Sequence, residues 1–184
     1  PIASLAKIMT AVLLVENHAL TEVVTIPTGA LSVNGSTAEF QPGERYTVRA
    51  LLGALLVESS NDAAYSLALF HSGNVENFVA EMNTRAQTLG LRRTHFANPM
   101  GFDSAEQEST PRDLAWLAMY VWKLAPIREF VGKREYVLRD YEGKREVTLH
   151  NTNRLLLSHP GSFFGLKTGT TELAGECLIS IAHV

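Results

Sequence analysis

The feature that most constrains the fold is a nearly apolar run close to the amino end, ASLAKIMTAVLLVEN. We predict a helix over residues 3–16. Its apolar side chains cover more than one helical face; they are Leu5, Ile8, Met9, Val12, Leu13 and Val15. A helix that is apolar nearly all round has to be covered by other elements on most sides. The sequence therefore predicts a central helix in a packed core.

The rest of the chain predicts mainly helices in the middle and strands near the carboxyl end. Capping residues, glycines and apolar periodicity mark further helices, with Asn74 and Thr110 as amino-terminal caps and Gly90 after a helix end. The predicted helices span about 48–57, 62–72, 74–89 and 111–125. Two alternating segments, 134–151 and 163–184, predict hairpins. This order is typical of an α+β fold.

Composition excludes several functional classes. The net charge is −3 with both signs mixed, which gives no basic footprint for nucleic acid or for an acidic membrane surface. The apolar runs are far shorter than the ~18 residues of a membrane span. Cys177, the single cysteine, stands in an apolar run and is interpreted as a core residue. The histidines show no metal-ligand spacing, so we expect neither a metal nor another cofactor.

A serine and a lysine share one face of the first predicted helix. Ser4 and Lys7 are three residues apart, which places their Cβ atoms roughly 5–6 Å from each other on a helix. A serine hydroxyl needs a nearby base to become nucleophilic. A lysine can be that base when burial lowers its pKa. The alternative is an exposed lysine on a surface helix.

Two later segments add polar groups in suitable places. In ESSNDAA, Ser59 and Asn61 stand at a break between two predicted helices, where side chains can project into a cleft. In GLKTGTT, Lys167 and Gly169 point to the same face of a predicted strand. We expect Gly169 to leave room for an extended peptide lying along an edge strand.

These segments match the S-x-x-K, S-x-N and K-T-G signature of penicillin-recognising serine enzymes, in the same order. The matching stretches are Ser4-Leu5-Ala6-Lys7, Ser59-Ser60-Asn61 and Lys167-Thr168-Gly169. With FANPMGFD, STPRDLA and NTNRLL, the chain resembles the serine D-alanyl-D-alanine carboxypeptidases, the low-molecular-mass penicillin-binding proteins, from end to end. Ala6 and Ser60 depart from the residues usual in that family, threonine and glycine.

The resemblance implies a catalytic role for three side chains. Ser4 is the expected nucleophile, which attacks the carbonyl between the last two D-alanines of a peptidoglycan stem peptide. Lys7 is the expected base for the Ser4 hydroxyl, and Ser59 is expected to relay a proton to the leaving amine. D-alanine then leaves, and water hydrolyses the acyl-enzyme.

The resemblance also implies substrate-binding residues. Asn61 is expected to hold Lys7 and a substrate amide, and Lys167 to attract the terminal carboxylate of the substrate and keep Lys7 uncharged. Thr168 and Gly169 complete the third motif, and the backbone N–H groups of Ser4 and Thr170 are the expected oxyanion hole. β-Lactams are expected to acylate Ser4 because they resemble the D-Ala-D-Ala terminus.

Two rival functions remain open. A class A-like β-lactamase needs a second carboxylate to activate water, and four candidates stand in no matching context; they are Glu106, Glu108, Glu142 and Glu146. A non-catalytic penicillin-binding sensor module would keep the acylation site without peptidase turnover. No nucleic acid partner is expected, and no membrane anchor is visible.

The family fold implied is an antiparallel sheet flanked by helices, beside an all-helical lobe. We expect one catalytic domain over 1–184, with the helical lobe at about 20–160 and the sheet at about 161–184. Only about two strands of the family's sheet can come from these residues, so the domain is expected to be partial. The implied substrate places the protein outside the cytoplasm, in the periplasm or cell envelope.

Overall fold

The computed structural model describes residues 1–159 and 161–182. The α-helices in chain order are α1 (Lys7–Asn17), α2 (Val48–Gly53), α3 (Asn61–Ser72), α4 (Val75–Thr88), α5 (Pro111–Val121), α6 (Ala125–Val131) and α7 (Arg154–Ser158). The strands are β1 (Val23–Thr25), β2 (Arg45–Thr47), β3 (Glu135–Arg139), β4 (Glu146–His150), β5 (Phe163–Thr171) and β6 (Gly175–Ala182). Within this part of the chain, no helix combines the length and apolarity needed to cross a membrane.

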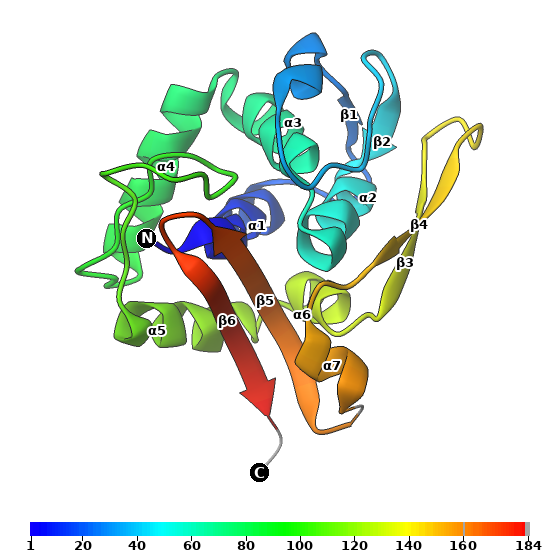
Figure 1. The fold of residues 1–184 in the computed structure, drawn as a ribbon. Coiled ribbons are helices and arrows are strands. Elements are labelled where there is room, and N and C mark those ends of the chain that lie inside the picture. Colours follow the sequence, from blue (N-terminus) through cyan, green and yellow to red (C-terminus); the bar gives the residue numbers. More distant parts are fainter. Residues whose placement is uncertain (160, 183–184) are drawn as a thin grey trace.

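The strands pair as three separate antiparallel two-stranded sheets, β1–β2, β3–β4 and β5–β6. Both predicted hairpins are therefore confirmed within the described residues, while positions 183 and 184 of the second lie outside them. In Figure 1 the β5–β6 hairpin runs past the amino end of α1, and the β3–β4 hairpin stands at the edge of the molecule. The fold is α+β, with helices gathered around the first helix.

Helix α1 is the centre of the core, as its apolar sequence predicted. Every residue from Lys7 to Leu14 is buried, and α1 packs against α3, α4 and α6. The predicted helix differs in its first turn, because residues Ala3–Ala6 form a 3-10 turn and Ala3 has a left-handed φ of 47°. Short 3-10 turns are frequent at helix ends, where the backbone bonds tighten.

The predicted helix at 48–57 is divided in two. It starts as α2, and Thr47 caps it by accepting a hydrogen bond from Ala50 N at 3.1 Å. It then widens into a π-helical turn over Ala54–Glu58, which ends at Ser59 with a left-handed φ of 68°. Such turns are rare and occur often at functional sites. The periodicity of an apolar run carries no signal for them.

The helix caps read from the sequence are confirmed. The Asn74 side chain accepts a hydrogen bond from Asn77 N at 2.7 Å at the start of α4, and Gly90 follows that helix with a φ of 76°. Thr110 accepts from Asp113 N at 3.2 Å at the start of α5, with Pro111 in the first turn. These caps satisfy backbone groups that a helix end leaves free.

Candidate active site

The three sequence motifs meet at one pocket of about 290 Å³. Six of the predicted site residues line it: Ser4, Ser59, Asn61, Thr168, Gly169 and Thr170. They come from the 3-10 turn before α1, the junction between the π-helical turn and α3, and strand β5. Residues more than 160 positions apart in sequence therefore line the same pocket. The two predicted lysines do not line the pocket and lie buried beside it.

Lys7 is placed to act on Ser4. Its Nζ atom lies 2.8 Å from Ser4 Oγ and donates to the carbonyl oxygen of Met100 at 2.6 Å. Burial lowers the pKa of Lys7 well below its ordinary value, Lys167 lowers it further by charge repulsion, and Asp62 partly opposes both. A neutral amine that gives one N–H to Met100 keeps a lone pair for the Ser4 hydroxyl proton.

The partner at Met100 was missed by the sequence analysis. The loop that carries it is fixed by Asn98, whose Oδ1 accepts from Gly101 N at 2.7 Å and from Phe102 N at 2.9 Å. Thr10 on α1 donates to the carbonyl oxygen of Pro99 at 2.9 Å. The sequence carries no signal for this contact, because a backbone carbonyl has no residue-type signature.

Two glycines allow neighbouring segments to touch the Ser4 backbone. A Cβ on Gly101 would lie 2.1 Å from Ala3 O, and the φ of Gly101 is 90°. A Cβ on Gly169 would lie 2.7 Å from Ser4 N. Gly169 therefore lets β5 approach the serine turn, while its expected role in leaving room for a peptide along the strand stays a prediction.

Ser59 projects from a strained position into the pocket. Its left-handed φ follows the π-helical turn, and the described residues provide no hydrogen-bond partner for its Oγ. The next residue, Ser60, caps α3 by accepting from Ala63 N at 3.2 Å and also donates to Asp62. Non-glycine residues with positive φ persist where surrounding structure holds them, often at functional sites.

Asn61 has a different partner from the one predicted. Its side-chain amide donates to the carbonyl oxygen of Asn34 at 2.7 Å, while Lys7 is held by Ser4 and Met100. The neighbouring Asp62 is buried and accepts from Ala38 N at 3.1 Å and, on its other oxygen, Phe40 N at 3.3 Å. Both side chains tie the loop before β2 to α3, and this loop forms one rim of the pocket.

Lys167 belongs to strand β5, and its side chain is buried rather than exposed at the pocket surface. It is 2% exposed and donates to the carbonyl oxygen of Thr168 at 2.8 Å. Burial lowers its pKa to about 7. Its repulsion of a charged Lys7 agrees with the sequence analysis, whereas its contact with a substrate carboxylate stays a prediction. The hydroxyl groups of Thr168 and Thr152 lie 2.5 Å apart across the pocket edge.

One carboxyl group at the pocket was not singled out as a candidate. Glu58 lines the pocket beside Ser59, and its buried Oε2 has no hydrogen-bond partner within the described structure. Burial raises the pKa of Glu58, and Asp62 raises it further. The four carboxylates weighed for a β-lactamase are not among the pocket residues: Glu106, Glu108, Glu142 and Glu146.

The remaining candidate groups are structural. Among residues 1–159 and 161–182, no group of three or more His, Cys, Asp or Glu side chains could hold a metal ion. Cys177 is partly buried and packs against the core from β6. The Asn151 side chain donates to the carbonyl oxygen of Lys133 and accepts from Asn153 N. The Asn153 side-chain oxygen caps α7, while its buried Nδ2 has no hydrogen-bond partner within the described structure.

Comparison with known proteins identifies the class. The structure is similar to the crystal structure of the Streptomyces K15 DD-transpeptidase, with a TM-score of 0.92 and 34% identity, in a match that covers all of this chain and 76% of that one. A Mycobacterium tuberculosis D-alanyl-D-alanine carboxypeptidase gives a TM-score of 0.92 at 29% identity and is covered to 69%. The fold is thus that of the DD-peptidases.

The family follows from the sequence. The family model for D-alanyl-D-alanine carboxypeptidase matches residues 1–184, and the chain belongs to this family. It is 38% identical over 185 residues to D-alanyl-D-alanine carboxypeptidase DacF of Bacillus subtilis, covering 98% of this chain and 47% of that protein. It is 36% identical to a D-alanyl-D-alanine carboxypeptidase of Streptomyces, in a match that covers 97% of this chain and 67% of that protein. The chain spans about half the length of the first of these relatives.

Proposed function

We propose that this chain carries the acylation centre of a serine D-alanyl-D-alanine carboxypeptidase that trims peptidoglycan stem peptides. The observation on which the proposal depends is the 2.8 Å contact between Lys7 Nζ and Ser4 Oγ, with Lys7 fully buried. Burial keeps the amine close to its neutral form, and only the neutral form can accept a proton. Membership of the family supports the same reaction.

The proposed reaction starts with proton transfer from Ser4 to Lys7. The Ser4 oxygen bonds to the carbonyl carbon of the D-Ala–D-Ala amide, and the carbonyl oxygen takes the negative charge. The backbone N–H groups of Ser4 and Thr170 would stabilise this oxyanion, an interaction whose loss typically costs ~10²–10³ in rate. The C–N bond then breaks, and the proton reaches the leaving amine through Ser59.

Hydrolysis of the ester completes the cycle. Water adds to the acyl carbon while its proton passes to Lys7, the bond to Ser4 Oγ breaks, and Lys7 returns the proton to the Ser4 oxygen, which restores the hydroxyl and the neutral amine. The same ester forms when Ser4 opens a β-lactam ring, because that ring is also an amide carbonyl. The substrate places the protein in the periplasm or cell envelope. The partners proposed are therefore stem peptides ending in D-Ala-D-Ala and β-lactam inhibitors.

The proposal is tested by labelling and by direct assay. A fluorescent penicillin should label the protein at the peptide containing Ser4, as mapped by mass spectrometry, and a D-Ala-D-Ala peptide should release free D-alanine. Ser4→Ala should abolish both, and Lys7→Met should lower the acylation rate by at least ~10²-fold, the contribution typical of a positioned base. Lys144→Gln, an exposed change on the β3–β4 hairpin, is the control.

The same assays separate the alternatives. Labelling without D-alanine release would indicate a sensor module. Rapid hydrolysis of a chromogenic cephalosporin would indicate a β-lactamase, with Glu58 as the carboxylate to test first because it is the one that lines the pocket. Labelling that persists in Ser4→Ala would overturn the assignment of the nucleophile.

A further inference from the structure

Most arginine side chains of this chain donate a hydrogen bond to an acceptor, and most of those that do not lie close to one another. Seven of the eleven arginines donate to a carboxylate or a carbonyl; they are Arg45, Arg49, Arg85, Arg128, Arg134, Arg139 and Arg145. Within the described chain, the other four have no such partner: Arg92, Arg93, Arg112 and Arg154. Three of these four line a single hollow.

That hollow has a volume of about 680 Å³ and lies away from the Ser4 pocket. Arg92 and Arg93 reach it from the turn after α4, and Arg112 reaches it from the first turn of α5. Its one carboxylate, Asp113, is buried and already accepts from Arg93 N and Thr94 Oγ1, both at 2.8 Å. Three arginines whose guanidinium groups have no acceptor within the described chain therefore line one hollow, in a protein whose net charge is −3.

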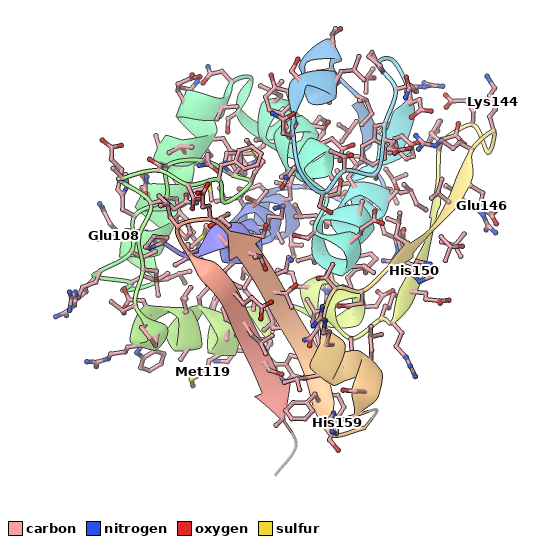
Figure 2. The ribbon with its side chains drawn as sticks, viewed as in Figure 1. Glu108, Met119, Lys144, Glu146, His150 and His159 are labelled. Atoms are coloured by element: carbon pink, nitrogen blue, oxygen red, sulfur yellow. The ribbon has the colours of Figure 1, made fainter. Side chains whose placement is uncertain are left out.

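The hollow continues onto an exposed face of α5. Residues 112, 116 and 119 follow spacings of four and three, so they lie along one side of α5. They are Arg112, Trp116 and Met119, all exposed, and the exposed Lys123 follows in the turn after the end of the helix. Trp116 is 52% and Met119 59% exposed. In Figure 2, Met119 points outward from α5 at the margin of the molecule.

Basic side chains next to exposed tryptophan and other large apolar side chains also occur on helices that lie in a membrane interface. Indole rings favour the headgroup level of a bilayer. Arginine suits phosphate because its planar fork can donate two hydrogen bonds to one group. Charge complementarity therefore selects an anionic lipid surface over a neutral one.

We propose that the face formed by Arg92, Arg93, Arg112, Trp116 and Met119 docks on a bilayer of anionic phospholipid, with a lipid phosphate in the arginine hollow. This surface was not expected from the net charge, since Arg112 is 19 residues from Arg93 in sequence. The fold brings these charges together. The proposal is independent of the chemistry at Ser4.

Vesicle binding tests it. The protein is sedimented with phosphatidylcholine vesicles and with vesicles of phosphatidylcholine and phosphatidylglycerol at 7:3. Binding should need the anionic lipid and should weaken as salt is added. Each basic residue near an anionic surface contributes a factor of about fivefold. Arg112→Gln should therefore weaken binding about fivefold, and the triple change Arg92→Gln, Arg93→Gln, Arg112→Gln on the order of 100-fold.

Matched variants separate the patch from general charge. Lys144→Gln also removes an exposed, unpaired cation, and Figure 2 places Lys144 on the β3–β4 hairpin, away from α5. It should bind like the unchanged protein. Trp116→Ala should weaken binding, and Trp116→Phe should restore most of it. Because these are exposed positions, the variants should stay folded, and circular dichroism with thermal unfolding provides the check.

Fluorescence reports insertion directly. Trp122→Phe leaves Trp116 as the single tryptophan, and its emission should shift to shorter wavelength on anionic vesicles and be quenched by brominated lipid. Equal binding to neutral and anionic vesicles, or equal loss in Lys144→Gln and Arg112→Gln, would overturn the proposal. So would vesicle binding unaffected by Trp116→Ala but abolished by millimolar glycerol phosphate, which would indicate a soluble phosphate ligand instead.

Discussion

At the scale of single residues, the site depends on two buried lysines that repel each other. Lys7 contacts Ser4 and Met100. The buried side chain of Lys167, on β5, has its pKa lowered to about 7. A charged Lys167 makes it harder for Lys7 to hold a proton. The two lysines therefore have different roles. Lys7 contacts the Ser4 hydroxyl, and Lys167 lowers the pKa of Lys7.

Replacing Lys167 should shift the pH dependence of acylation. Lys167→Met removes the repulsion, so the pKa of Lys7 rises and more of it is protonated at a given pH. The acid limb of the acylation rate should move to higher pH, as measured with fluorescent penicillin between pH 5 and 9. The midpoint is compared rather than the rate, because substrate binding can also change. Lys144→Gln should keep its midpoint, and a limb unmoved in Lys167→Met would contradict this coupling.

At the scale of elements, local signals were sufficient for some features and insufficient for others. Caps at Asn74 and Thr110 were predictable because the side chain and the backbone group it satisfies are three residues apart. The π-helical turn before Ser59 was not, since its width depends on packing around it. The Met100 carbonyl was not predictable because it reaches Lys7 across 93 residues.

A matched pair of glycine changes tests the fit of the Asn98–Gly101 loop against the serine turn. Gly101→Ala places a methyl group against Ala3 O, so the Ser4 backbone has to move. A displacement near 1 Å can cost ~10²-fold in rate, and we expect at least that loss of acylation. Gly43→Ala has a similar φ of 85° with nothing within 4 Å. It should lose about 1–2 kcal/mol of stability from backbone strain and keep its rate.

Stability measurements would contradict this account if they showed that Gly101→Ala is simply unfolded. Circular dichroism and thermal unfolding of both variants therefore accompany the rates. If the two glycine changes reduced acylation equally, contact with Ala3 would be irrelevant, and φ alone would explain the loss.

At the scale of the whole molecule, the two buried lysines make the free energy of unfolding depend on pH above 7. Between pH 7 and 10.5 an unfolded chain keeps Lys167 protonated, while the folded chain has largely lost that proton. The unfolded state then binds more protons, so the free energy of unfolding increases with pH. Lys7 acts in the same direction.

Urea unfolding should show this rise. From pH 7.5 to 9.5 the free energy of unfolding should increase by about 2–5 kcal/mol, since each of the two lysines contributes up to about 1.4 kcal/mol per pH unit. Lys167→Met should lose much of the increase, and Lys144→Gln should keep it. A stability that falls over this range in the unchanged protein would show that neither lysine is neutral in the folded state.

The pocket also has a consequence for how the chain is made. Its walls contain Ser4, Ser59, Gly101, Thr152 and Thr170, so the first contributor is synthesised long before the last. Contacts of such long range form late, after loop closure has been achieved. A nascent chain carrying Ser4 but not yet β5 lacks the part of the pocket wall that Thr168, Gly169 and Thr170 supply. The complete pocket can therefore form only after synthesis has passed residue 170.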